Sequence, residues 1–377
     1  MENLGLICMK TSLCEIVGIE YPIFAFSHCR DVVIEVSRAG GIGVLGAHRY
    51  SPEKLDLTLS IIEDKLKGKP YGVNCLFPVS AATEERVTFN PPSTHTEFME
   101  KLRMELDLKS KPIEYGEDFG VGEGLVISDQ RALELIDVIL RHRPRLIASG
   151  LGPMPLSLMD TLRRRGVLTV AQVGQPKQAR RQVELGFDII VATGTEAAGH
   201  TGEIGSLVAV PQIVDSVAPV PVLAGGGVAD GRQIAAALAL GAEGVWMGSA
   251  WLTTLESDLH PLVKQKLIAA SSADTVLTRC FTGKPSRQLR TSWTDAWEAP
   301  GAPKPLPAPH QGKLVSGALI SAFIRNRTDL MGTPAGQSIG MLKDIISVRE
   351  TFQQLLLQYV SAVERLDKIN STIHTGE

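Results

Sequence analysis

A single histidine, His200, stands in a glycine-rich segment that directly follows an apolar run. Residues 188–193 have the pattern of a short buried strand, and residues 194–202 are mostly small. An imidazole titrates near neutral pH and can take a proton from a substrate. The small neighbours of His200 leave its ring room to face a bound molecule, so we predict that His200 is a catalytic base. A purely structural ring is the alternative, and Glu196, for which an ion pair is the simpler expectation, is the other candidate base.

Three consecutive glycines mark a second candidate site, which would bind an anion. Gly225, Gly226 and Gly227 follow an apolar run at residues 222–224 and precede a helical pattern at residues 230–240. Amides without side chains can approach a phosphate closely, and a helix N-terminus adds a favourable field. A tight turn without a ligand is the alternative.

The next apolar run, residues 244–247, is also followed by residues that could bind an anion. The amides of Met247 and Gly248 and the hydroxyl of Ser249 could complete the anion site. In eight-stranded α/β barrels, the loops after strands seven and eight commonly bind phosphate. The two strand ends together therefore favour a phosphate site.

Other polar residues at strand ends are weaker candidates. Asn74 ends the third apolar run and offers both a donor and an acceptor to a cofactor ring, while Gln172 and Gln175 flank the end of the fifth run. His28 and Cys29 could suggest a thiolate nucleophile, but adjacent side chains rarely face each other.

Residues 41–46 contain the letters of the dinucleotide fingerprint GxGxxG. That fingerprint requires a strand before it and a helix that begins within it. Here a helical pattern precedes the segment and the apolar strand lies inside it. We therefore interpret these residues as packing glycines and not as a nucleotide site.

Eight apolar runs alternate with helical patterns over the first two thirds of the chain. Strands that alternate with helices form parallel sheets, and eight such units match a closed (β/α)8 (TIM) barrel better than an open doubly wound sheet. The runs are residues 21–26, 42–45, 71–74, 146–149, 168–173, 188–193, 222–224 and 244–247.

Two segments lie outside this alternation. The pattern weakens between residues 78 and 123, which we predict to be an insertion after the third strand. We expect the barrel to occupy residues 1–258. A C-terminal, mainly helical domain on the substrate side should occupy residues 259–377, with its end packed back on the barrel. Helices are predicted at residues 339–346 and 348–366.

The composition narrows the class of protein. A net charge of −3 and 5% aromatic residues argue against nucleic-acid binding, and no apolar stretch is long enough to span a membrane. The N-terminus lacks the pattern of a signal peptide. We expect a soluble, cytoplasmic protein without a metal site. Its cysteines should be free thiols; they are Cys8, Cys14, Cys29, Cys75 and Cys280.

These motifs together resemble the nitronate monooxygenase family, formerly called 2-nitropropane dioxygenases. The most specific match is the Glu-Ala-Ala-Gly-His segment at residues 196–200, followed by the glycine triplet. Residues 336–340 resemble the family's closing segment, where the chain returns to the barrel. The other matching segments are residues 21–23, 39–46, 71–74, 221–231 and 241–249.

The resemblance implies a flavin enzyme with FMN as its cofactor. His200 would take the α-proton of a nitroalkane or orient a nitronate, and the reduced flavin would pass electrons to O2. The partners would be this small-molecule substrate and O2, with no nucleic acid and no membrane, and a homodimer is left open. The cofactor-binding positions would be Asn74, Thr193, Ala198, Gly199, Gly225, Gly226, Gly227, Met247, Gly248 and Ser249.

The sequence also differs from the family at positions that would face the flavin. The family usually has glutamine in place of Thr193, glycine in place of Ala198 and threonine in place of Ser249, and residues 25–29 replace an Ala-Pro-Met segment. Two alternative functions therefore stay open. One is NAD(P)H-dependent reduction of a quinone or an enoyl thioester, and the other is FMN binding without catalysis.

Overall fold

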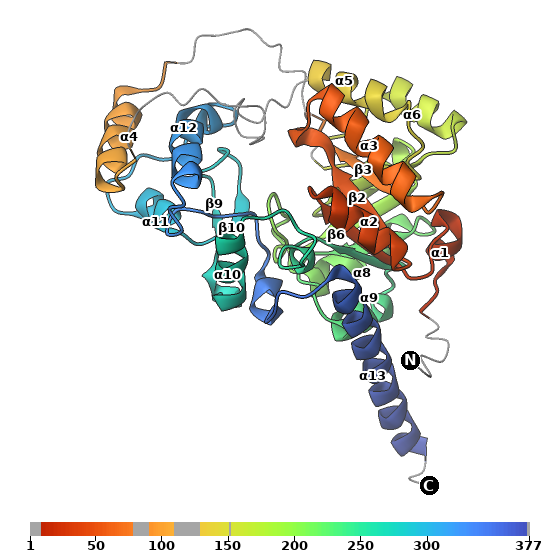
Figure 1. Cartoon of the computed structure of the whole chain (residues 1–377). Coiled ribbons are helices and arrows are strands. Elements are labelled where there is room, and N and C mark those ends of the chain that lie inside the picture. Colours follow the sequence, from red (N-terminus) through yellow and green to blue (C-terminus); the bar gives the residue numbers. More distant parts are fainter. Residues whose placement is uncertain (1–8, 78–89, 109–128, 151, 375–377) are drawn as a thin grey trace.

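Eight parallel strands close into a barrel, as the sequence predicts (Figure 1). The computed structural model describes residues 9–77, 90–108, 129–150 and 152–374. The barrel closes where β1 pairs with β8, with Ile23 opposite Val245. The strands are β1 (Ile23–Ser27), β2 (Ile42–Gly46), β3 (Gly72–Cys75), β4 (Leu146–Ser149), β5 (Leu168–Val173), β6 (Ile189–Thr193), β7 (Val222–Gly225) and β8 (Gly244–Met247).

A helix follows each strand and covers the outside of the barrel. The helix α3, for example, begins where Ser51 Oγ accepts a hydrogen bond from the Lys54 amide and Pro52 takes the first helical position. The barrel helices are α2 (Arg30–Arg38), α3 (Pro52–Leu66), α5 (Asp129–Ile139), α6 (Leu156–Arg164), α7 (Pro176–Glu184), α8 (Ser206–Val217), α9 (Gly231–Ala239) and α13 (Val348–His374).

The helix that completes this outer layer, α13, comes long after its strand. It packs against α9, where Gly231 allows the two backbones to meet, because a Cβ there would lie 2.2 Å from the Leu355 carbonyl oxygen. The Gly231 amide also donates to Gln358 Oε1 over 3.0 Å. The end of the chain therefore packs back on the barrel, and α13 extends beyond it in Figure 1.

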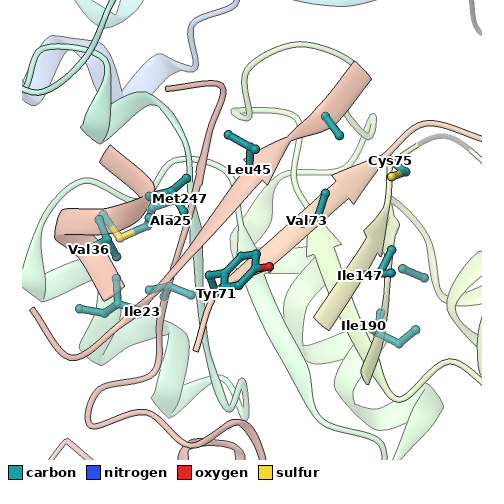
Figure 2. Close-up of a cluster of buried hydrophobic side chains, with 14 of the residues drawn as sticks. Ile23, Ala25, Val36, Leu45, Tyr71, Val73, Cys75, Ile147, Ile190 and Met247 are labelled. Carbon is teal, nitrogen blue, oxygen red and sulfur yellow. The ribbon is translucent and has the colours of Figure 1, made fainter. Parts of the chain in front are cut away.

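Alternate residues of each strand face the inside and the outside of the barrel. Inward-facing side chains such as Phe24, Val44 and Trp246 form one buried cluster. The outward-facing set packs under the helices, and Figure 2 shows part of it, including Ala25 and Met247. This alternation decides which side chains reach the open end of the barrel.

The helix α1 (Ser12–Val17) closes the amino end of the barrel. Its buried side chains Leu13 and Val17 join the inward-facing cluster. The Thr11 hydroxyl donates to the carbonyl of Glu243 over 2.7 Å, and Glu243 directly precedes β8. Among the described residues, α1 thus fills the amino end, and the carboxyl end is where barrels of this kind bind ligands.

A second group of elements lies beside the barrel (Figure 1). Its hydrophobic cluster combines Met99 of α4 (Ser93–Glu105), Trp293 of α11 (Ser292–Glu298) and Val315 of α12 (His310–Ile324). The described part of the predicted insertion, residues 90–108, thus packs against C-terminal elements. Residues 78–89 and 109–123 of that insertion lie outside the described residues.

The C-terminal region is mainly helical, as predicted, but it also contains a hairpin. The helix α10 (Pro261–Ala269) precedes β9 (Thr275–Thr278), which pairs with β10 (Ser286–Leu289) in antiparallel fashion. The helix predicted at residues 339–346 is wrong. The chain there forms the short 3-10 helix η5 (Gln337–Met341), and residues 342–347 are not helical. Gly340 of η5 packs against Ser272, since an added Cβ would lie 2.5 Å from Ser272 Oγ.

The packing-glycine interpretation of residues 41–46 is confirmed. A Cβ at Gly43 would lie 2.3 Å from the Val33 carbonyl oxygen of α2, and one at Gly41 would lie 2.7 Å from the Ile23 carbonyl oxygen. These glycines allow close approach between strand and helix. Four of the five cysteines, Cys14, Cys29, Cys75 and Cys280, are free and buried.

Within the described ranges, no helix has the length and apolar character to cross a bilayer. The same ranges contain no group of three or more His, Cys, Asp and Glu side chains arranged to hold a metal ion.

An ionic cluster links α3 to the chain after α5. His142 Nδ1 lies 3.0 Å from Glu63 Oε2, and His142 Nε2 lies 3.2 Å from Asp56 Oδ1. Hydrogen bonds from His142 and Arg141 lower the pKa of Asp56. Burial raises the pKa of Glu63, but hydrogen bonds from His142 and the Arg143 amide outweigh it, so this pKa is also lowered.

This cluster predicts a specific loss of stability in acid. A carboxylate whose pKa is lowered by folding stabilises the fold above its unfolded value, here 3.8 for Asp56 and 4.5 for Glu63, and loses that contribution as the pH falls further. We expect the unfolding temperature to decrease as the pH falls below these values, and His142→Gln to flatten that decrease. Thermal unfolding measured across this pH range tests it. An equally steep decrease in the variant would contradict the assignment.

Candidate active site

Two polar side chains at the open end of the barrel have buried hydrogen-bonding atoms that are not used by other described residues. Asn74 is the next-to-last residue of β3 and is 2% exposed, and Thr193 is the last residue of β6. Asn74 Nδ2 and Thr193 Oγ1 are buried and have no hydrogen-bond partner among the described residues. A buried polar atom left without a partner costs about 1–3 kcal/mol. Both atoms are therefore suited to bind a ligand that enters from the carboxyl end.

Aromatic rings line the opposite side of the same end. The rings of Phe26 on β1 and Trp246 on β8 are stacked, with their centroids 6.2 Å apart and their planes 21° apart. His28 continues this group, with its ring centroid 5.1 Å from that of Phe26. The barrel end thus has an aromatic side and a polar side, and a flat molecule with apolar faces and polar edges would match both.

The glycine triplet after β7 has a backbone suited to an anion. Gly226 and Gly227 have φ values of +95° and +77°, in the left-handed region. Their carbonyls are engaged, because Gly226 O accepts from Ser206 Oγ over 3.2 Å and Gly227 O accepts from Gln233 Nε2 over 2.5 Å. Neither amide makes a backbone hydrogen bond to another described residue. Successive amides in such a turn can bind a phosphate.

The helix after the triplet contributes less than the sequence indicates. The first amides of α9 are already bonded, that of Arg232 to Asp230 Oδ1 over 2.8 Å and that of Gly231 to Gln358. An anion would therefore be held by the loop amides, and the amides of α9 would not take part.

The residues after β8 lie against the closing segment. Ser249 Oγ accepts a hydrogen bond from the Gly336 amide over 2.9 Å, so the serine hydroxyl keeps its own hydrogen for a ligand. A Cβ added to Gly248 would meet only the Phe26 ring, at 4.0 Å. The return of residues 336–340 to the barrel, which the resemblance implies, is present in the structure. The side chain of Met247, in contrast, points into the outer layer (Figure 2).

The ring of His200 has a defined hydrogen-bond partner. His200 Nδ1 lies 2.8 Å from the carbonyl oxygen of Pro285. A carbonyl can only accept, so Nδ1 carries the hydrogen and Nε2 of the neutral ring holds the lone pair. Burial lowers the pKa of His200, the hydrogen bond to Pro285 opposes this, and the positive charge of Lys284 lowers the pKa further. The net decrease favours the neutral ring that a base requires.

The strand β10 holds the backbone beside His200. The Gly199 amide donates to the Arg287 carbonyl over 3.0 Å, and the Arg287 amide donates to the Gly199 carbonyl over 2.7 Å. Ala198 lies next to the closing segment, residues 336–340. A Cβ added to Gly336 would be 3.2 Å from the amide nitrogen of Ala198. Sequence reasoning missed Pro285 and Arg287, and no motif or periodic pattern marks either of them.

The other candidate base and the candidate nucleophile have structural partners. The Glu196 carboxylate accepts from the Ser206 amide over 3.0 Å and from its hydroxyl over 2.9 Å, at the start of α8. The Cys29 thiol donates to the carbonyl of Glu256 over 3.1 Å, and burial raises its pKa. Glu196 is thus a helix cap, and Cys29 stays a thiol.

Comparison with known proteins places the chain in a family. The family model described as nitronate monooxygenase matches residues 10–358. A Mycobacterium tuberculosis protein with a provisional monooxygenase name is 44% identical, over 95% of this chain and 98% of its own length. A provisionally named nitronate monooxygenase of Bacillus subtilis is 30% identical, over 85% of this chain and 89% of its own length.

A solved structure agrees with these relatives. The nitroalkane oxidase of Streptomyces ansochromogenes matches with a TM-score of 0.76 and 25% identity, over 94% of this chain and 99% of its own. The family match covers most of the chain. The closed barrel and the polar and aromatic residues at its strand ends are consistent with that match. This chain belongs to the nitronate monooxygenase family and is a flavin-dependent oxidoreductase.

Proposed function

We propose that this protein binds FMN at the carboxyl end of its barrel and oxidises nitronates or nitroalkanes with O2, with His200 as the base. The observation that carries the proposal is the hydrogen bond from His200 Nδ1 to the Pro285 carbonyl, because it leaves Nε2 as the proton acceptor. The family membership of the chain supplies the class of substrate.

The residues at the barrel end fit FMN. The amides of Gly226 and Gly227 and the hydroxyl of Ser249 would hold its phosphate. Asn74 Nδ2 and Thr193 Oγ1, which lack partners among the described residues, would bond the polar edge of its ring. Ala198, Gly199 and Gly248 would line the site through their backbone. Bound FMN would supply the two-electron acceptor that the side chains of the protein lack.

The protein's own part in the reaction is binding and proton transfer. His200 Nε2 would accept the α-proton of a neutral nitroalkane, or donate a hydrogen bond to a nitronate once the ring is protonated. The aromatic rings of Phe26 and Trp246 would exclude water from the side opposite the polar atoms.

The predicted domain at residues 259–377 would lie on the substrate side. Its strand β10 pairs with Gly199, directly beside the proposed base. We therefore include this strand in the proposed active site.

The visible spectrum of the purified protein tests the cofactor. We expect a flavin spectrum, with FMN released on denaturation, and anaerobic bleaching by a nitronate that is faster than bleaching by NADH. If the purified protein contains no flavin and takes up no added FMN, the proposal is rejected. If NADH reduces the bound flavin rapidly and nitronate does not, the NAD(P)H-dependent alternative is favoured. Bound FMN that neither compound reduces would favour binding without catalysis.

A further inference from the structure

We infer that Arg287 is a positioning residue that fixes the orientation and the tautomer of His200 through the strand β10. The inference deepens the proposed function, on which its kinetic part rests. Arg287 acts through the loop that carries the base, which it contacts at Thr195 and at Gly199.

The guanidinium group of Arg287 bonds the start of that loop. Arg287 Nε donates to the carbonyl of Thr195 over 2.9 Å, and Nη1 lies 3.3 Å from the hydroxyl oxygen of Thr275 on the neighbouring strand β9. The residue is only 8% exposed. A planar guanidinium has donors in a fixed fork, so one side chain can join the hairpin and the loop at a set distance.

The main chain of Arg287 bonds the loop at a second point. Its amide and carbonyl form the paired hydrogen bonds with Gly199, the residue directly before His200. Gly199 has a φ of +69°, a conformation that favours glycine, and the pairing holds the backbone there. The loop is thus fixed on both sides of Ala197 and Ala198, at Thr195 and at Gly199.

The same short segment contacts the ring itself. The carbonyl of Pro285, two residues before Arg287, accepts the hydrogen bond from His200 Nδ1 over 2.8 Å. This bond exists only while the strand and the loop stay in register. Without it, the hydrogen of a neutral imidazole can move to Nε2, and the ring then has no lone pair there. Arg287 therefore determines which nitrogen is available to a substrate.

The burial of the Arg287 guanidinium indicates that its hydrogen bonds to the loop and to β9 are specific. A buried cation is costly unless hydrogen bonds satisfy it, and here the partners are a carbonyl and a hydroxyl, with the negative charge of Glu196 nearby. Arg290, at the other end of the hairpin, is an exposed counterpart that bonds Asp295 over 2.9 Å. The two arginines form a matched pair for an experiment.

The test compares Arg287→Ala, Arg287→Lys and Arg290→Ala. The first readout is the nitrogen NMR spectrum of protein labelled with 15N-histidine, in which a His200→Asn sample assigns the His200 signals. The second readout is kcat and KM for a neutral nitroalkane with the flavin-loaded enzyme. Flavin content and the unfolding temperature are measured for every variant.

We expect wild-type His200 to show a protonated Nδ1 and an unprotonated Nε2. Arg287→Ala should move the hydrogen partly to Nε2 and lower kcat about 100-fold, as expected for a displaced catalytic group, with KM and flavin content little changed. Arg287→Lys should give values between those of the wild type and Arg287→Ala in both readouts, because an ammonium group cannot reproduce the forked donors of a guanidinium group. Arg290→Ala should match the wild type in both readouts.

Unchanged His200 signals in Arg287→Ala would overturn the inference, whatever the kinetics. So would wild-type kcat in that variant, or equal loss of kcat and flavin. If Arg287→Ala does not fold, Arg287→Lys decides through the same signals. The NMR readout requires neither turnover nor flavin, so it stands or fails separately from the proposed nitronate activity.

Discussion

Replacing His200 with alanine is expected to lower kcat for a neutral nitroalkane by about 100- to 10,000-fold, the range for loss of a general base, while flavin stays bound. The flavin should stay because the glycine and strand-end residues that would hold it are separate from the imidazole. Steady-state oxygen consumption and the visible spectrum measure the two quantities. A nitronate prepared in advance has already lost its α-proton, so its oxidation should decrease much less.

The control for this variant is His260→Asn. His260 Nδ1 accepts a hydrogen bond from the Leu262 amide at the start of α10, and asparagine can form the same kind of cap. This variant should keep its activity. Equal decreases for nitroalkane and nitronate after His200→Ala, or no decrease for either, would remove the base role.

The pH dependence of kcat/KM provides a linked observation. Burial lowers the pKa of His200 from its ordinary value of 6.5, so the neutral ring is present at pH 7 and is lost only as the pH falls below that value. The acid side of the profile should therefore lie below pH 6.5.

Gly226→Ala should produce the second large effect, a weakening of FMN binding on the order of 100-fold. A Cβ at this position would lie 3.0 Å from both the Cβ and the amide nitrogen of Ala197, and the φ of +95° adds roughly 1–2 kcal/mol of strain. The loop amides would move away from the phosphate. Loss of two hydrogen bonds to a charged group, at about 1.5 kcal/mol each, corresponds to this change in Kd. Titration of flavin-free protein with FMN measures it.

Gly68→Ala is the matched control for Gly226→Ala. Gly68 has nearly the same φ, +94°, but nothing lies within 4 Å of the position of its Cβ. It carries the same backbone strain and lies away from the strand ends, after α3. Equal FMN affinity in both variants, and an unfolding temperature lowered by the same amount, would show that Gly226 has no role in binding.

The barrel could be predicted because its strands are short apolar runs. Parallel strands buried on both faces are almost continuously apolar, and residues 189–193 show this pattern without ambiguity. The direction of each side chain needs the register as well. Met247 and Trp246 are neighbours in sequence, yet only Trp246 faces the inside of the barrel. The prediction of Met247 as a cofactor contact stays untested, and its side chain points away from the barrel end.

The hairpin strand could not be predicted from the same signals. All four residues of β10 are buried, but three of them, Ser286, Arg287 and Gln288, are polar. Their burial comes from contacts with β9 and with the loop at Gly199, which lies far away in sequence. Local pattern cannot show a strand whose partners are tertiary, and the partner of His200 is therefore invisible before the fold is known.

The place of α13 in the chain determines when the barrel can be completed during synthesis. The helix covers α9 and α2, but it is made after β8, after the hairpin and after α12. The ribosome must therefore release about a hundred further residues after β8 before the last gap in the helical layer is filled. Until then the apolar partners of Phe352 and Leu355 are exposed to solvent and to other chains. The helical layer of the barrel can therefore be completed only after the elements beside the barrel have been synthesised.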